Sequence, residues 1–287
     1  MRTPAAEVDL DESVVARLIR AQHPDLADRA LTLATNGWDN AIYRLGDDLC
    51  VRLPRRLVAV ELLVNEHRWL PLLAGNVTTP IPVPLRAGEP AFGYPWPWTV
   101  TRWFEGRIAA GLAPSRRGQI ARELGEFMAG WHVPAPPDAP RSPVRGIPLP
   151  RRDPGVREGL ASGVMPFSQD LQQLWDELVD TPPWTDPPVW LHGDPHPANF
   201  LIDPRGDLVV LDFGDLSAGD PATDLAAGWL VFDAEARETF REAANPDEHT
   251  WARARGWALA LGIAFVMHSD DNPMMAAIGN HTLAQVL

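Results

Sequence analysis

Three residues, Asp194, Asn199 and Asp212, have the types and the spacing that chemistry on a phosphate group would need. Asn199 follows Asp194 by five positions in LHGDPHPAN, and Asp212 follows by eighteen in LDFGD. Phosphoryl transfer needs a carboxylate that orients the attacking hydroxyl and takes its proton, and Mg²⁺ prefers oxygen ligands. We therefore predict Asp194 as the catalytic base and Asn199 and Asp212 as magnesium ligands.

The residues around this group resemble a known family. Asp-x-x-x-x-Asn followed by Asp-Phe-Gly is the order of these parts in protein kinases. The form His-Gly-Asp-x-His at 192–196, together with GDPATDL at 219–225, resembles the aminoglycoside phosphotransferase family. The matching block covers residues 190–225, and a weaker match in the expected order extends over most of the chain.

This resemblance implies a bilobal, protein-kinase-like α+β fold with a small β-rich N-lobe and a larger, mainly helical C-lobe. It implies a kinase that uses Mg²⁺ to move the γ-phosphate of ATP or GTP to a hydroxyl of a small molecule. We predict a nucleotide-binding lobe over residues 1–102 and a catalytic and substrate-binding lobe over residues 103–287.

On the nucleotide side, the resemblance assigns roles by order along the chain. Arg52 falls where such kinases carry the basic residue that binds the α- and β-phosphates, and Glu66 falls where a helix holds that residue. The usual residue is lysine, but all 25 basic residues of this chain are arginine. The alternatives to these roles are that Arg52 is an exposed charge on a strand and that Glu66 is a solvated residue on a helix. Trp103 lies in the segment that is expected to meet the nucleotide base. Its ring either stacks on that base or only packs within the protein.

The two histidines of the motif have rival interpretations. The resemblance implies that His192 supports the loop by hydrogen bonding to a carboxylate such as Asp220 or Asp224, and that His196 lines the loop. A hydrolase would instead use His192, Asp194 and His196 as a transition-metal site. A third hypothesis is a non-catalytic nucleotide-binding module.

Hydrophobic periodicity predicts the elements that must position these residues. Asp9, Ser115 and Ser168 are expected as helix N-caps. The proline-rich segment 134–154 is expected to be a loop. We predict strands at 31–35, 41–45, 49–53, 85–88 and 98–102, a hairpin of 199–202 with 208–211, and helices at 58–73, 120–131, 168–178, 222–229, 234–244 and 247–268.

The amino-acid composition limits the kinds of partner that the protein is expected to bind. The net charge of −13 argues against a nucleic-acid partner. It either favours cationic ligands through the field of the acidic surface or serves only solubility. The single cysteine, Cys50, excludes an intramolecular disulfide and a cysteine-based metal site. No apolar run approaches the roughly 20 residues that cross a bilayer, and no apolar signal segment opens the chain. We predict a cytoplasmic protein without a membrane partner.

The acceptor is the least determined part of the prediction. An aminoglycoside or related antibiotic, and hence a role in antibiotic resistance, is the first hypothesis. A macrolide, choline, homoserine and a methylthio-sugar are the alternatives. Carboxylates that could meet a cationic acceptor are Asp153, Glu158, Asp233, Glu235, Asp270 and Asp271.

Overall fold

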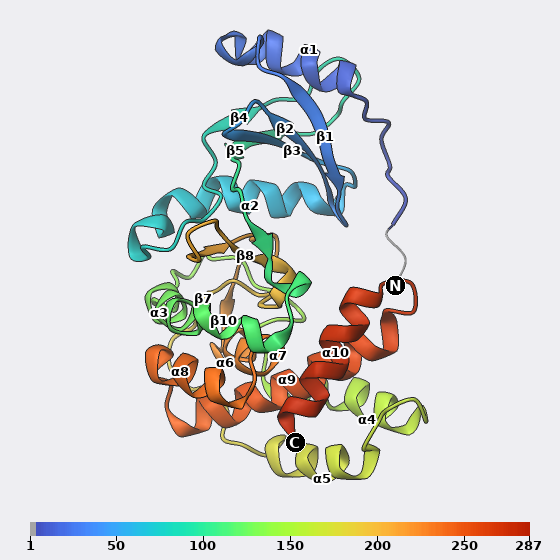
Figure 1. The fold of residues 1–287 in the computed structure, drawn as a ribbon, viewed down its shortest axis with the longest axis vertical. Coiled ribbons are helices and arrows are strands. Elements are labelled where there is room, and N and C mark those ends of the chain that lie inside the picture. Colours follow the sequence, from blue (N-terminus) through green and yellow to red (C-terminus); the bar gives the residue numbers. More distant parts are fainter. Residues whose placement is uncertain (1–3) are drawn as a thin grey trace. The chain divides into compact units, whose positions relative to one another are not determined.

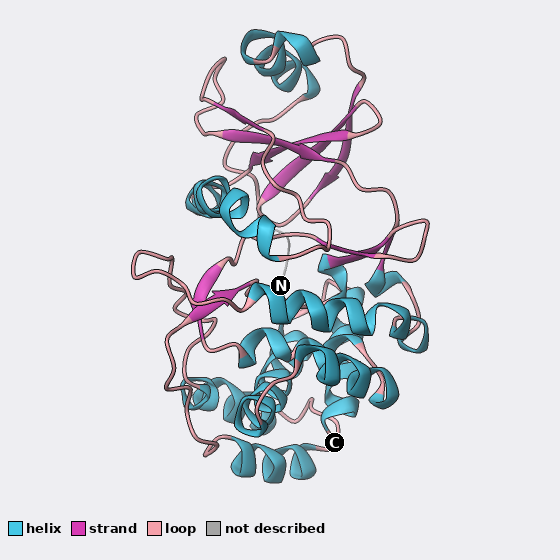
Figure 2. Cartoon of the chain, turned by 90° about the vertical axis from the view of Figure 1, so that its left-hand side faces the viewer, coloured by secondary structure: helices cyan, strands magenta, loops and turns pink. Residues whose placement is uncertain are grey.

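The computed structural model describes residues 4–287, which form two compact units. The N-terminal unit contains the described residues up to Gly75 together with Ile81–Glu105, and the C-terminal unit contains Asn76–Pro80 and Gly106–Leu287. The larger sheet belongs to the N-terminal unit (Figure 1), and most of the helices belong to the C-terminal unit (Figure 2). The predicted fold class, α+β with a β-rich first part and a helical second part, is confirmed.

The N-terminal unit is built on a five-stranded antiparallel sheet with strand order β1-β2-β3-β5-β4. Residues alternate between buried and partly exposed along β2, as expected for a strand with one face in a core. Its elements are α1 (Glu12–Gln22), β1 (Leu31–Asn36), β2 (Asn40–Leu45), β3 (Leu49–Pro54), α2 (Val58–Leu73), β4 (Arg86–Gly88) and β5 (Trp98–Arg102).

Helix α1 packs on this sheet through one apolar face. Val15 and Leu18 are fully buried in a cluster that also contains Tyr43 and Trp98. The carboxylate of Asp11 accepts the hydrogen bond from Val14 N that starts the helix. The predicted cap at Asp9 is therefore wrong. The cap must directly precede the first helical residue so that its side chain reaches the free N–H groups of the first turn.

The long helix α9 lies at the centre of the packing in the C-terminal unit, where it contacts α4, α5, α6 and α10. Two small sheets, β6-β8-β9 and β10-β7, lie in the same unit. Its elements are β6 (Arg107–Ile108), α3 (Ala121–Trp131), α4 (Asp153–Ala161), α5 (Ser168–Leu178), β7 (Val189–Leu191), β8 (Phe200–Ile202), β9 (Leu208–Val210), β10 (Ser217–Gly219), α6 (Ala222–Leu225), α7 (Ala227–Val231), α8 (Ala234–Ala244), α9 (Glu248–His268) and α10 (Pro273–Val286).

Two further cap predictions are wrong in this unit. Ser115 lies in a short 3₁₀ turn, and α3 begins only at Ala121. Ser168 is itself the first residue of α5, and the cap position belongs to Phe167, whose φ of 54° is left-handed and whose side chain makes no capping bond. No helix within residues 4–287 is long and apolar enough to cross a membrane.

Candidate active site

The loop after β7 is held at its start by one buried carboxylate. Asp224, at the end of the chain's GDPATDL segment, is fully buried on α6. Its two oxygens accept hydrogen bonds from His192 N at 2.7 Å and Gly193 N at 2.9 Å. The ring of His132 lies 3.2 Å from the same carboxylate. Charge-assisted bonds to two successive backbone N–H groups fix where the loop leaves the strand.

The ring of His192 makes a different set of contacts from the predicted bond to a carboxylate. Asp194 N donates to Nδ1 at 3.2 Å, so Nε2 carries the proton and donates to Leu211 O at 2.9 Å. It is the backbone N–H of His192, and not its ring, that meets Asp224. Because both ring nitrogens are engaged, His192 has no nitrogen available for a transition metal, which argues against the hydrolase interpretation.

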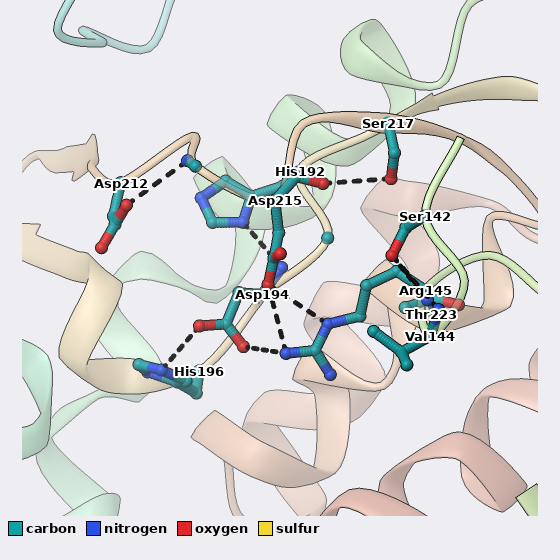
Figure 3. A network of polar contacts seen from close by, with 12 residues as sticks. Ser142, Val144, Arg145, His192, Asp194, His196, Asp212, Asp215, Ser217 and Thr223 are labelled. Carbon is teal, nitrogen blue, oxygen red and sulfur yellow. Dashed lines mark hydrogen bonds and ion pairs between the residues drawn. The ribbon is translucent and has the colours of Figure 1, made fainter. Parts of the chain in front are cut away.

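The carboxylate of Asp194 is held from several sides (Figure 3). The Nε2 atom of His196 lies 3.1 Å from Oδ2, and the Nδ2 atom of Asn199 donates to Asp194 O at 2.9 Å and to Oδ2 at 3.3 Å. A 3₁₀ turn at Pro197–Asn199 brings the amide back towards Asp194. The structure thus places the predicted base and one predicted magnesium ligand in direct contact.

Asp212 is exposed and adopts a backbone conformation that is rare for residues other than glycine. Its φ is 58°, and its Oδ1 atom accepts a long hydrogen bond of 3.4 Å from Gly214 N. Strained backbone of this kind is concentrated at functional sites. The carboxylate of Asp212 and the amide of Asn199 offer hard oxygens, the ligand type that Mg²⁺ prefers. Within residues 4–287, no group of three or more histidine, cysteine or acidic side chains is arranged so that these side chains alone could hold a metal ion.

Arg145 is a site residue that the sequence reasoning missed. Its Nη2 atom donates to Asp194 Oδ1 at 2.9 Å and to Asp215 Oδ2 at 3.3 Å, and its Nε atom also donates to Asp215. Figure 3 shows Asp194 between His196 and Arg145. The guanidinium therefore links the predicted base to the residue that follows Asp-Phe-Gly.

Gly146 explains how Arg145 reaches this position from the proline-rich loop. The φ of Gly146 is 62°, and a Cβ atom there would lie 2.5 Å from Leu191 and 2.8 Å from Gly219. Gly146 N donates to the hydroxyl of Thr223, and Gly146 O accepts from Asp220 N. Only glycine allows the loop backbone to approach β7 and β10 this closely, and the side chain before it then points at Asp194.

These contacts determine the charge of the site. Burial acts to raise the pKa of Asp194, but the nearby charges of His196 and Arg145 outweigh it and hold this pKa well below its usual range. Burial opposes the charged form of His196, yet the carboxylate of Asp194 raises its pKa. Burial and the charge of Asp194 raise the pKa of Asp215, against the opposing effect of Arg145. Asp194 is thus ionised, and Arg145 supplies a permanent positive charge beside it.

The remaining predicted residue of the loop support, Asp220, has a separate partner. Its carboxylate accepts from Arg253 Nε at 2.7 Å and Nη2 at 3.2 Å, which joins the segment before α6 to α9. Two of the carboxylates considered for a cationic acceptor also have structural partners: Asp153 pairs with Arg157, and Asp233 accepts from Ala236 N at the start of α8.

Within the N-terminal unit, Arg52 and Glu66 form a buried, two-bond ion pair. Arg52 Nη1 lies 2.5 Å from Glu66 Oε2, and Nη2 lies 3.0 Å from Oε1. Arg52 and Glu66 are 6% and 1% exposed, so they are neither an exposed strand charge nor a solvated helix residue. The indole of Trp103 donates to Glu105, and the guanidinium of Arg44 lies over its ring.

Comparisons of the sequence with known proteins identify one family. A sequence model described as "Phosphotransferase enzyme family" matches residues 30–257. A comparison with curated proteins gave no match.

Several solved structures share the fold. The GDP and kanamycin complex of APH(2")-IIIa superposes with a TM-score of 0.69 and 19% identity, over 96% of this chain and 98% of that one. Macrolide 2'-phosphotransferase MphH from Brachybacterium faecium superposes with a TM-score of 0.61 and 20% sequence identity, over 94% of this chain and 97% of that one. A choline/ethanolamine kinase family protein from Mesorhizobium loti superposes with a TM-score of 0.61 and 20% sequence identity, over 96% of this chain and 93% of that one.

Proposed function

This chain belongs to the phosphotransferase enzyme family, as its sequence predicted, and on that premise we propose that it transfers the γ-phosphate of ATP or GTP to a hydroxyl of a small molecule. The observation that carries the proposal is the ionised carboxylate of Asp194, held by His196 and Arg145 beside Asn199. A fixed carboxylate is what phosphoryl transfer needs to align an attacking hydroxyl.

In the proposed reaction, the acceptor hydroxyl donates a hydrogen bond to Asp194. The bond from the hydroxyl oxygen to the γ-phosphorus forms as the bond to the bridging oxygen of the nucleoside diphosphate breaks. Because its pKa is held low, Asp194 orients the hydroxyl first and accepts the proton late, when bonding to phosphorus has made that proton acidic. The loose transition state of phosphoryl transfer makes this order favourable.

Asn199 and Asp212 would hold Mg²⁺ through their side-chain oxygens. When bound, the ion neutralises charge that develops on the transferred phosphate. In the N-terminal unit, Arg52 would bind the α- and β-phosphates, with Glu66 holding its guanidinium through two hydrogen bonds. Trp103 is the candidate contact for the base. Arginine suits this role because its planar fork matches phosphate oxygens.

The family alone does not choose the acceptor. The structural relatives are named for kanamycin, a macrolide and choline or ethanolamine, and a shared fold does not fix the substrate. We therefore propose a hydroxyl group of a small molecule as the acceptor.

A coupled nucleotide-turnover assay tests the proposal. ATP and GTP are supplied in parallel with Mg²⁺, against aminoglycosides, macrolides, amino alcohols, polyols and hydroxy acids. The expected result is acceptor-dependent release of nucleoside diphosphate, with a product heavier by one phosphoryl group. Binding of nucleotide without turnover for every acceptor class would instead favour the non-catalytic module.

A further inference from the structure

Helix α2 exposes large apolar side chains on one of its faces. Leu57, Val58, Val64 and Leu72 are each between 48% and 68% exposed. Leu57 is the N-cap residue, and its φ of −58° and ψ of −39° already have helical values, so its side chain continues the pattern of the helix. Single exposed apolar residues are ordinary, but a row of them along one helix indicates a surface that meets another molecule.

This face is opposite to the one that carries the ion pair with Arg52. Glu66 follows Leu57 by nine positions, about two and a half turns of an α-helix, and therefore lies on the other side of α2. The buried residues Leu63 and Leu70 share the side of Glu66. A partner bound to the exposed face would therefore leave the pair of Arg52 and Glu66 uncovered.

The exposed face also carries one acid and one base, and its residue types are arranged symmetrically. Glu61 and Arg68 are both exposed, and they lie at equal distances from a midpoint between positions 64 and 65. Apolar residues mirror apolar residues about this midpoint, whereas the acid mirrors the base. We call this face the α2 stripe, and its residues in chain order are Leu57, Val58, Glu61, Val64, Asn65, Arg68, Pro71 and Leu72.

A surface with this symmetry is complementary to a second copy of itself that lies antiparallel. A two-fold axis through the midpoint places Glu61 opposite Arg68 of the partner subunit and Leu57 opposite Leu72 of the partner subunit. The axis repeats each contact, so the interface has two ion pairs and two such apolar contacts. Within one chain, Glu61 and Arg68 are seven positions apart, beyond the spacings of three and four at which side chains of one helix meet.

We propose that the α2 stripe is the interface of a homodimer, in which α2 of one chain packs antiparallel against α2 of a second copy. The alternating spacing of four and three positions along Leu57, Glu61, Val64, Arg68 and Pro71 suits two helices that cross at a small angle. A helix of 16 residues is about 24 Å long. One pair of such helices buries less area than a standard interface, so the dimer is weak and depends on concentration.

Arg68 can enter this interface without losing the contacts that it makes in its own chain. Its guanidinium lies over the ring of Trp69 at 4.4 Å. A guanidinium has five N–H donors, so it can keep its present contacts and still donate to a carboxylate of a second chain. The proposal requires only that Arg68 present a positive charge at the surface, and this residue is exposed.

Charge reversals test the proposed pairing. Sedimentation of the full chain over a range of concentrations measures the dissociation constant of the dimer, and the wild type should show a monomer–dimer equilibrium. Glu61→Arg and Arg68→Glu each place like charges opposite one another at two points, which should raise the dissociation constant at least about tenfold. Arg122→Glu, at an exposed position of α3, is the matched control and should dimerise as the wild type does.

A mixture of the two reversed variants separates lost pairing from damage to the fold. The Glu61→Arg chain is basic at both positions, and the Arg68→Glu chain is acidic at both. An equal mixture should therefore form a heterodimer about as tightly as the wild type forms its homodimer, and the double variant should recover the homodimer.

Three results would overturn the proposal. They are a wild type that stays monomeric at every concentration, a dissociation constant that neither reversal changes, and a mixture that forms no heterodimer. The inference goes beyond the proposed reaction and does not rest on it. None of these measurements uses nucleotide, so their outcome is independent of the turnover assay.

Discussion

Arg145 donates a hydrogen bond to the carboxylate of Asp194 at 2.9 Å across 49 positions of sequence. The same Nη2 atom lies 3.3 Å from Asp215. The orientation of the proposed base therefore depends on a loop that carries no catalytic motif.

Replacement of Arg145 should damage both stability and turnover. Arg145→Met leaves the carboxylates of Asp194 and Asp215 together without their shared cation. A fully buried pair broken in this way loses 3–5 kcal/mol, and because these carboxylates are 26% and 37% exposed we expect about 2 kcal/mol. Chemical denaturation measures the stability change, and nucleotide turnover in the same samples measures the effect on the site.

A double variant separates charge from packing in that experiment. Adding Asp215→Asn to Arg145→Met removes the repulsion between the two carboxylates and should recover about 1 kcal/mol of the loss. Additive effects of the two substitutions would contradict the bridging role of Arg145.

Asp194→Asn should abolish phosphoryl transfer while leaving nucleotide binding close to that of the wild type. The amide has nearly the same shape as the carboxylate but cannot accept the hydroxyl proton as a base does. Turnover and nucleotide affinity are measured on the same preparation, with Asp186→Asn as an exposed control outside the site. If turnover stays within about tenfold of the wild type, a cost near 1.4 kcal/mol, Asp194 is not the essential base.

Asp212→Asn should differ from Asp194→Asn in its dependence on magnesium. Loss of the exposed carboxylate removes a charged oxygen ligand, so nucleotide binding should weaken and need more Mg²⁺ to recover. Titration of nucleotide at several Mg²⁺ concentrations measures the shift. Identical Mg²⁺ dependence in this variant and in the wild type would remove Asp212 from the proposed metal site.

Arg52→Ala should raise the KM for nucleotide and lower the stability of the N-terminal unit. The substitution removes a phosphate contact and also leaves Glu66 buried without its two-bond partner. Arg52→Lys keeps the charge and should restore part of the nucleotide affinity. Arg20→Ala, on the exposed side of α1, is the control. If Arg52→Ala binds nucleotide as tightly as the wild type does, Arg52 does not bind the phosphates.

The sequence predicted those parts of the molecule that local pattern determines. The helix Val58–Leu73 and the hairpin of β8 and β9 follow from periodicity and turn residues. The N-caps predicted at Asp9, Ser115 and Ser168 were wrong, because a capping residue type does not identify which of several neighbouring positions becomes the cap.

Arg145 could not be found in the same way. Its segment has no periodicity, and its side chain reaches Asp194 only because Gly146 lies against β7 and β10. That close approach is a tertiary contact between distant parts of the chain. A glycine beside an arginine in a proline-rich loop was the available indication, and such a pair is too common to single out a site residue.

Gly193→Ala should separate the strain of a left-handed backbone from a steric clash beneath the base. Gly193 has a φ of 90°, and a Cβ atom there would lie 2.3 Å from Asp215 O and 2.8 Å from Asp215 Cβ. Gly163 has a similar φ of 78° with nothing within 4 Å of the added Cβ atom.

Gly163→Ala should therefore lose about 1 kcal/mol from backbone strain alone. Gly193→Ala should lose at least about 3 kcal/mol, because a clash against backbone adds to the strain. Chemical denaturation of both variants measures the difference. Since the loop must move to relieve the clash, turnover should fall in Gly193→Ala and stay unchanged in Gly163→Ala. Equal losses of stability in the two variants, with turnover retained in both, would show that the backbone of Asp215 does not constrain the loop that carries Asp194.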